Sequence, residues 1–168
     1  VYRLDVLIGD VLRCLADEGL DDDTLIVYST DHGDQLGERG LWWKHTLYED
    51  SVRVPLVLRW PGHLPAGERR TQVVDLLDVA ATMAAALGGP ALPYAHGRNL
   101  LPIARDASAP WIDEIFAEHC TDTVPAWTGG RTAQQRMIRS GNWKLIYAHG
   151  YPVQLYDLAA DPHERRNL

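Results

Sequence analysis

Residues 24–45, TLIVYSTDHGDQLGERGLWWKH, pass from an apolar, β-branched run directly into a loop rich in charged side chains. The run at 24–29 has the composition of a short strand that is buried on both faces. The loop that follows it, at 30–53, is far longer than the roughly 2–6 residues that usually join elements of an α/β layer. Because α/β sheets bind ligands beyond the carboxyl ends of their strands, this loop is the candidate functional region.

Helical and strand patterns alternate on both sides of this segment. Residues 4–15 place leucine, isoleucine and valine at helical spacing, and Gly19 is a natural helix stop. Residues 54–60, VPLVLRW, predict a second strand, and residues 71–89 predict a second helix. This alternation predicts an α/β layer with a largely parallel sheet.

The composition changes after residue 89. Residues 90–110 are rich in proline, glycine and alanine, which is typical of an irregular connection. Short strand-like runs follow, with Gly141-Asn142 as a hairpin turn, and they predict a small antiparallel sheet. The last residues, DPHERRNL at 161–168, read as an exposed tail. We therefore expect an α/β domain at 1–89 and, at 90–168, an irregular connection followed by a small antiparallel sheet subdomain.

Bulk properties exclude several classes of function. The 168-residue chain carries a net charge of -7 and no block of lysine or arginine, which argues against nucleic acid as a partner. No apolar run approaches the roughly 18 residues that span a bilayer, so we expect no membrane partner. Only Cys14 and Cys120 are thiols, which favours a reducing, cytoplasmic location. The chain opens inside a helical pattern without Met or a signal peptide, so we expect a piece of a longer protein.

Asp31 and His32 follow the strand directly, and a carboxylate beside an imidazole can ligate a divalent cation. Two consecutive residues do not complete such a site, because a hard ion takes about six oxygen ligands or waters. Gly33 allows a sharp turn that brings backbone close to a ligand. Lys44 supplies a compact cation suited to an anionic oxygen. Together these residues predict a metal ion acting on an anionic ester.

Plainer interpretations exist for the same residues. Residues 31–33 also have the composition of an ordinary strand-ending turn. Glu38 and Arg39 read as a solvated pair that contributes little to stability. Trp42 and Trp43 are expected to cover the core, the alternative being a wall for a cationic substrate group.

Several motifs resemble the sulfatase family of the alkaline-phosphatase-like superfamily. The stretch at 24–62, TLIVYSTDHGDQLGERGLWWKHTLYEDSVRVPLVLRWPG, resembles the family's late catalytic segment, and its LGERGLWWKH portion is most similar to choline-sulfatase and phosphonate-monoester-hydrolase-type members. Four later stretches resemble family elements in the right order: VVDLLDVAATMAAALG at 73–88, HGRNLLPI at 96–103, RMIRSGNWKLIY at 136–147 and QLYDLAADPHERRNL at 154–168. The second helix departs from the family's D-[LI]-x-P-T form because Ala80-Ala81-Thr82 replaces the proline.

The resemblance implies a fold, a reaction and roles for particular residues. It implies the C-terminal part of an alkaline-phosphatase-like α/β sandwich, followed by the small antiparallel sheet. Asp31 matches a metal ligand, and His32 matches a position that contacts the metal or the ester oxygen. Lys44 matches the lysine that contacts the sulfate and assists the leaving group, whereas His45 matches no functional position. The implied metal is Ca²⁺, or Mn²⁺ in members with Asp-His.

The implied nucleophile is absent from this chain. Sulfatases use a formylglycine made from Cys or Ser in Cys/Ser-x-Pro-x-Arg, whereas LADE follows Cys14 and TDTV follows Cys120. Both cysteines are therefore expected to be small structural residues. We expect the formylglycine in an N-terminal part that this chain lacks, and we expect the isolated chain to be inactive and to bind metal weakly.

Three functions remain in view. The first is a fragment of a metal-dependent sulfatase that hydrolyses small sulfate monoesters. The second is a phosphonate or phosphate ester hydrolase of the same superfamily, which would use the same metal and Lys44. The third is a binding or assembly module without chemistry. In each case we expect the isolated chain to self-associate through surface that the missing portion would cover.

Overall fold

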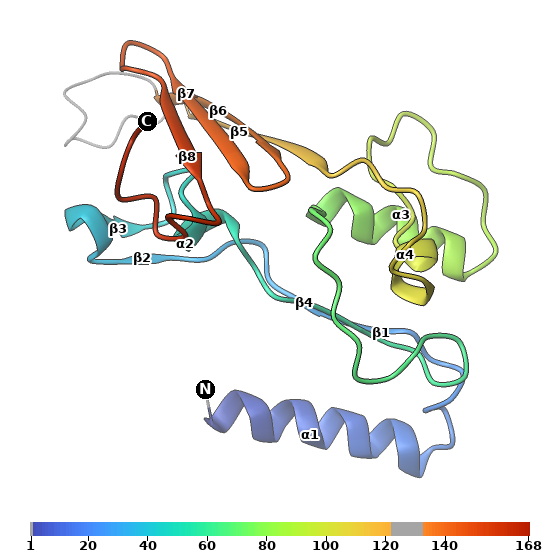
Figure 1. Ribbon diagram of the computed structural model, residues 1–168. Helices are drawn as coiled ribbons and strands as arrows, with labels where there is room; N and C mark the ends of the chain where they lie inside the picture. Colours follow the sequence, from blue (N-terminus) through green and yellow to red (C-terminus); the bar gives the residue numbers. More distant parts are fainter. Residues whose placement is uncertain (1, 122–132) are drawn as a thin grey trace. The chain divides into compact units, whose positions relative to one another are not determined.

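The computed structural model describes residues 2–121 and 133–168 (Figure 1). The chain packs as two compact units whose segments alternate along the sequence. Unit 1 consists of Val1–Tyr28, Leu56–Arg70 and Leu77–Pro110, and unit 2 consists of Ser29–Pro55, Thr71–Leu76 and Trp111–Leu168. The division of the chain into domains at 1–89 and 90–168 stays a prediction. Among the described residues, none of the helices is long and apolar enough to cross a bilayer.

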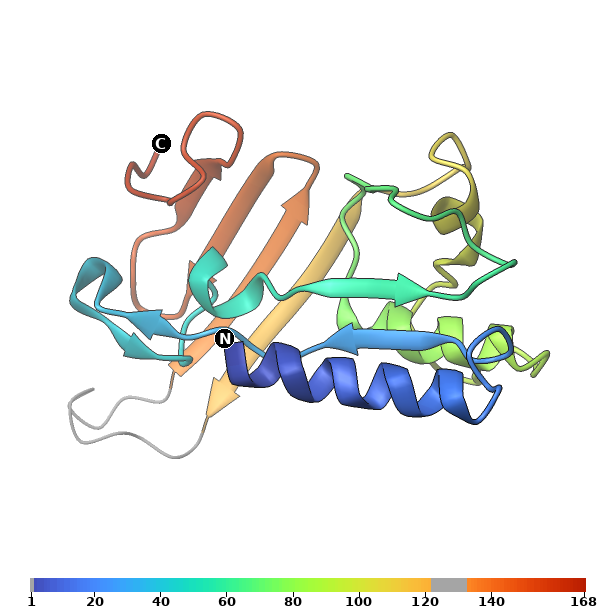
Figure 2. The same cartoon turned by 90° about the horizontal axis from the view of Figure 1, so that it is seen from below.

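Unit 1 is built mainly from three helices and two strands: α1 (Tyr2–Asp17), β1 (Ile26–Ser29), β4 (Leu56–Arg59), α3 (Leu76–Ala86) and α4 (Leu101–Arg105). Both predicted strands and both predicted helices are present. β1 and β4 pair as a two-stranded sheet and run in opposite directions (Figure 2). The alternating helical and strand patterns predict a largely parallel sheet, but this pair is antiparallel. Parallel strands need a long crossover connection, usually a helix, and no such helix lies in the described stretch between β1 and β4.

A buried polar cluster ties α3 to the connection that follows it. The Asp78 carboxylate accepts hydrogen bonds from the Arg98 backbone N–H at 2.7 Å and from Arg98 Nη2 at 3.0 Å. The Thr82 hydroxyl donates to the Asp78 carbonyl at 2.6 Å and accepts from the Leu100 N–H at 2.8 Å. A Cβ at Gly97 would lie 2.0 Å from the Leu77 carbonyl oxygen. Two of the quoted motifs, 73–88 and 96–103, are thus one packing unit.

The two cysteines lie at the surface. Cys14 is on α1, which buries none of its residues, and Cys120 is on β5. Both side chains are exposed and neither forms a disulfide. The expectation that both are small structural residues does not hold, because neither thiol is buried and α1 buries none of its residues.

Unit 2 contains the predicted antiparallel sheet. Its strands lie in the order β5 (Glu114–Thr121), β6 (Ala133–Ser140), β7 (Trp143–Ala148) and β8 (Gln154–Asp157) (Figure 1). The turn between β6 and β7 is Gly141-Asn142, and the φ of 55° at Gly141 is one that favours glycine. The core on this sheet consists of Leu47, Met137, Ile146, Tyr156 and Leu158.

The long loop after β1 carries short elements of its own: β2 (Gln35–Leu36), a 3₁₀ turn (Glu38–Gly40), β3 (Trp42–Trp43) and α2 (Glu49–Val52). β2 and β3 form a hairpin in which Leu36 pairs with Trp42. Trp42 is 66% exposed and Trp43 is 60% exposed. The expectation that they cover the core is wrong, because a hairpin of two-residue strands offers no layer that could bury both rings.

Most residues of the C-terminal segment are exposed, as its composition suggests, but the segment is anchored by hydrogen bonds and one buried residue. Glu164 is only 2% exposed and has a positive φ of 51°. The Asn167 side chain accepts from the Leu155 N–H at 2.8 Å and donates to the Val153 carbonyl at 3.2 Å. The Leu168 N–H donates to the Leu155 carbonyl at 3.0 Å. The segment therefore continues the hydrogen bonding at the edge of β8.

Candidate active site

The corner at residues 31–33 is fixed against α2. The Gly33 N–H donates to the Ser51 carbonyl at 2.8 Å. A Cβ at position 33 would lie 2.2 Å from the Asp50 carbonyl oxygen, so only glycine allows the two backbones to approach this closely. The close approach that Gly33 allows is to the backbone of α2, and it fixes where the preceding Asp31 and His32 leave β1. Its predicted approach to a ligand stays a prediction.

The structure brings the three predicted site residues together. The Nδ1–H of His32 donates to the Gly33 carbonyl at 2.9 Å, so in the neutral ring Nε2 carries the lone pair. Lys44 Nζ lies 2.5 Å from that Nε2 atom and donates to it. Asp31 Oδ2 lies 3.4 Å from the same nitrogen. A carboxylate, an imidazole and an ammonium group therefore meet at one point, although Lys44 is far from the other two in sequence.

Asp31 keeps its charge at neutral pH. Its side chain is 81% exposed. Partial desolvation raises the pKa of Asp31, but the charge of His32, a hydrogen bond from its own backbone, the Thr30 hydroxyl and Lys44 together lower that pKa below its ordinary value. The accessible carboxylate is thus ionised and able to bind a cation.

The donor set fits part of a divalent-metal site. Asp31 Oδ2 and His32 Nε2 are 3.4 Å apart, which is the separation expected of two adjacent ligands that each lie roughly 2.2–2.4 Å from one ion. Across residues 2–121 and 133–168, no three His, Cys, Asp or Glu side chains gather as a metal site. This part of the chain therefore offers two ligands, and a hard ion needs more from elsewhere.

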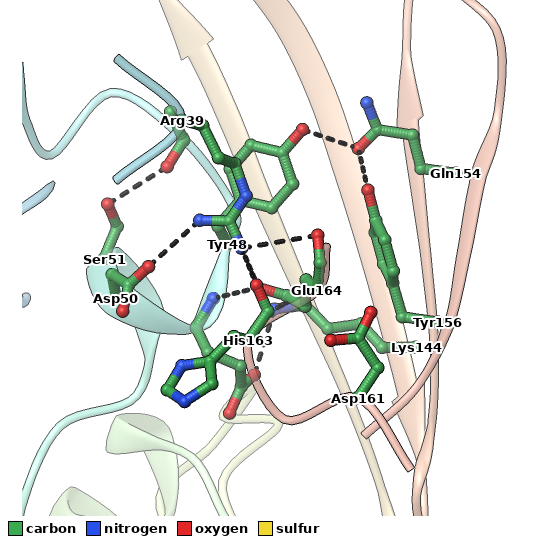
Figure 3. A network of polar contacts seen from close by, with 12 residues as sticks. Arg39, Tyr48, Asp50, Ser51, Lys144, Gln154, Tyr156, Asp161, His163 and Glu164 are labelled. Atoms are coloured by element: carbon green, nitrogen blue, oxygen red, sulfur yellow. Dashed lines mark hydrogen bonds and ion pairs between the residues drawn. The ribbon is translucent and has the colours of Figure 1, made fainter. Parts of the chain in front are cut away.

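A buried ion-pair network surrounds Lys144 in the same unit (Figure 3). Lys144 on β7 is fully buried, and its Nζ lies 3.0 Å from Glu49 Oε1 and 2.7 Å from Glu164 Oε1. Glu164 Oε2 also accepts from the Glu49 backbone N–H at 2.7 Å. Arg139 Nη1 lies 3.4 Å from the second Glu49 oxygen. Each buried charge thus has an opposite charge in contact, as burial of ions requires.

Arg39 joins the same network from the loop. Its guanidinium lies over the Tyr48 ring at 4.1 Å and donates to Asp50 Oδ2 at 3.0 Å. It also donates to the His163 carbonyl of the C-terminal segment. The Arg39 side chain is 21% exposed. The interpretation of Glu38 and Arg39 as a solvated pair is therefore wrong for Arg39, whose partners come from α2 and the chain terminus.

The network supports the corner through α2. Glu164 holds the first residue of α2, Glu49, and the carbonyl of Ser51 in the same helix holds Gly33. The Ser51 hydroxyl is 3.0 Å from the Thr46 hydroxyl, two residues beyond Lys44. The C-terminal segment, α2 and both sides of the candidate site therefore form one connected set of contacts within unit 2.

Comparisons with known proteins place the chain in a family. The family profile described as Sulfatase matches residues 1–89. Choline-sulfatase of Rhizobium meliloti (strain 1021) is 39% identical over 174 residues, which cover all of this chain and 31% of that protein. Arylsulfatase K of Mus musculus is 34% identical over 169 residues, covering 98% of this chain and 30% of that protein. The chain thus spans about a third of the length of these curated relatives.

A solved structure shows the same fold. The phosphonate monoester hydrolase of Agrobacterium radiobacter superposes with a TM-score of 0.84 at 29% sequence identity, covering 99% of this chain and 35% of that protein. The expected fold class, an alkaline-phosphatase-like α/β sandwich part followed by a small antiparallel sheet, is confirmed.

Proposed function

Because this chain belongs to the sulfatase family, we propose that it supplies the C-terminal half of the active site of a metal-dependent hydrolase of small sulfate monoesters. The observation that carries the proposal is the meeting of Asp31, His32 and Lys44 at the end of β1. An ionised carboxylate, an imidazole lone pair and an ammonium group suit a cation and an anionic ester better than an apolar ligand.

The residues of this chain have separate tasks in the proposed reaction. Asp31 and His32 hold a divalent ion, Ca²⁺ or Mn²⁺, which when bound offsets negative charge on the sulfate group. Lys44 exchanges its hydrogen bond to His32 for one to a sulfate oxygen, where its positive charge stabilises the transition state. Its ammonium proton can then pass to the departing alcohol oxygen as the S–O bond breaks. The hydrogen bond to Gly33 keeps the His32 ring in one orientation throughout.

This chain contains no sulfatase nucleophile. The closest sequence to Cys/Ser-x-Pro-x-Arg starts at Ser108, reads SAPWI, and ends in Ile112 where arginine is required. We therefore propose that the formylglycine lies in an upstream segment of the complete protein. The isolated 168 residues would then bind metal weakly and hydrolyse no ester.

A phosphonate or phosphate ester hydrolase is the second candidate, and the similarity to the phosphonate monoester hydrolase structure favours it. Tetrahedral sulfate, phosphate and phosphonate groups can use the same cation and the same lysine. A module that keeps the fold without chemistry is the third candidate, and it requires an upstream segment without a nucleophile motif.

Hydrolysis assays on the complete protein separate these candidates. An aryl sulfate and an aryl phosphonate monoester are compared in the presence of Ca²⁺ or Mn²⁺. Preference for the sulfate, with loss of turnover in Lys44→Ala, supports the proposal. Preference for the phosphonate would favour the phosphonate or phosphate ester hydrolase over the sulfatase. If a correctly folded, metal-loaded protein hydrolysed neither ester, both hydrolase candidates would be contradicted.

A further inference from the structure

Two imidazole rings from distant parts of the sequence face each other in unit 2. His45 directly follows Lys44, and His119 lies on β5. Their ring centroids are 5.6 Å apart and their planes are inclined by 48°. Gln135, the partner of His119 across the strands, donates from its side chain to the His45 carbonyl at 3.3 Å. Two independent contacts therefore place these rings together, and the proposed hydrolysis uses neither of them.

The His119 ring holds an unsatisfied nitrogen. Its Nε2 atom is buried and, within the part of the chain that the structure describes, lacks a hydrogen-bond partner. Such atoms are rare in folded proteins, because an unpaired buried polar group loses its hydration without compensation. A metal ion is one partner that such an imidazole nitrogen accepts.

We propose that His45 and His119 form a site for a divalent transition-metal ion such as Cu²⁺, Ni²⁺ or Zn²⁺. Two rings that share one ion at metal–nitrogen distances of about 2.0–2.1 Å have centroids roughly 4.5–6.5 Å apart, depending on the angle between the bonds, and the observed separation lies within that range. Imidazole suits these borderline ions, whereas the carboxylate of Asp31 suits a hard ion. The two sites therefore differ in the class of metal they select.

The site is open on the side away from the protein. The His45 side chain is exposed, and no third His, Cys, Asp or Glu of the described residues completes the ligand set. Water or a substrate group fills the remaining positions. Two imidazoles predict the affinity order of the Irving–Williams series, with Cu²⁺ bound more tightly than Ni²⁺ or Zn²⁺. Because His45 adjoins Lys44, an ion here would link the backbone beside Lys44 to β5.

Copper titration of the 168-residue chain tests the proposal. Cu²⁺ is added near neutral pH, and binding is followed by the d–d absorption band and by electron paramagnetic resonance, which reports nitrogen ligands. We expect His45→Ala and His119→Ala each to weaken the binding by about tenfold or more, since even second-shell changes at metal sites cost that much. His149→Ala, which removes another exposed histidine, should leave the affinity unchanged.

His45→Ala is the variant least able to disturb the fold, so it gives the clearest result. Because His45 is exposed, its replacement should leave the fold intact, and circular dichroism checks this for every variant. Unchanged copper affinity in folded His45→Ala, or an equal loss in His149→Ala, would overturn the proposal. Since the readout is copper binding alone, the result is independent of whether the complete protein hydrolyses sulfate esters.

Discussion

Two carboxylates hold the ammonium group of Lys144, which has no exposed surface at all. Removing one member of such a buried set leaves the remaining charges desolvated without a partner. In this case Glu49 would keep only the more distant Arg139 and Glu164 only the more distant Arg39, at 3.4 Å and 3.6 Å. The effect of losing Lys144 should therefore exceed that of losing an exposed lysine by a wide margin.

Replacing Lys144 with methionine tests this view of the network. We expect Lys144→Met to reduce the free energy of unfolding by about 3–5 kcal/mol, as measured by urea denaturation. The chain contains one other lysine, the exposed Lys44, which provides a matched control. Lys44→Met should change the same quantity by no more than about 0.5 kcal/mol. If Lys144→Met and Lys44→Met lost the same amount of unfolding free energy, the buried network would make no special contribution to stability.

His119 gives the stability a pH dependence with a defined sign. Burial and the nearby His45 lower the folded-state pKa of His119 below its ordinary value of 6.5, so the unfolded chain binds this proton more readily. The free energy of unfolding should therefore fall as the pH drops through 6.5 towards the folded-state pKa. Urea denaturation between about pH 7.5 and 5 should show a shallower fall in His119→Gln. An unchanged slope in that variant would assign the pH dependence to other groups.

Residue type and the resemblance to a family segment single out Asp31, His32 and Lys44, which the structure brings together, while their roles stay predictions. Lys144 could not be found in this way. In β7 the residues Trp143 and Leu145 point outward, while Lys144 points inward, which is the reverse of what hydrophobic alternation suggests. Only the arrival of carboxylates from two distant segments explains the buried lysine.

At the scale of elements, close packing between α3 and residues 96–100 makes a specific prediction. A methyl group at Gly97 would overlap the Leu77 carbonyl, so Gly97→Ala should destabilise unit 1 by about 1–3 kcal/mol. Gly9, within α1, has only an ordinary contact at 3.5 Å with an arginine side chain. Gly9→Ala should instead stabilise the helix by up to about 1 kcal/mol. Thermal unfolding followed by circular dichroism compares the two variants, and shifts of the same sign would contradict the packing described.

The elements that sequence reasoning predicted are those defined by local pattern. α1, β1, β4, α3 and the hairpin at Gly141-Asn142 each have their own periodicity or turn chemistry. The anchoring of the C-terminal segment could not be read from its solvated composition, because Glu164 contacts Glu49, which is 115 residues away. The exposure of Trp42 was missed because aromatic composition does not reveal whether a short hairpin has a covering layer.

At the scale of the whole molecule, the apolar stripe of α1 is uncovered. Leu4, Leu7 and Val11 are 51%, 53% and 61% exposed, and no residue of this helix is buried. Apolar stripes of this kind are normally covered by another part of a protein or by a partner. The chain spans about a third of the length of its curated relatives, so further chain is available in those proteins to provide such a cover.

We therefore expect the isolated 168 residues to self-associate through α1. Light scattering over a concentration series should show a mass that rises with concentration. Leu7→Glu, combined with Val11→Glu on the same face, should shift the equilibrium towards the monomer. A wild-type chain that stays monomeric at high concentration would contradict this expectation.

The α/β class and the small antiparallel sheet followed from pattern, but the grouping of segments into compact units did not. Residues 29–55 belong to the same unit as the C-terminal sheet, because the ion pairs of Glu49 and Arg39 join them. A local sequence pattern cannot predict a contact between two side chains that are separated by most of the chain. The residues of the candidate site stand out in the sequence, whereas the network that supports them depends on such long-range contacts.

The central claim is that Lys44, next to Asp31 and His32, acts on an anionic ester. Steady-state hydrolysis of an aryl sulfate by the complete, metal-loaded protein tests it most directly, with Lys44→Ala compared with Arg69→Ala as an exposed-charge control. We predict that kcat/KM falls by about 100-fold or more in Lys44→Ala, with unchanged thermal stability, and stays at the wild-type value in Arg69→Ala. Wild-type turnover in the Lys44→Ala protein would contradict the account.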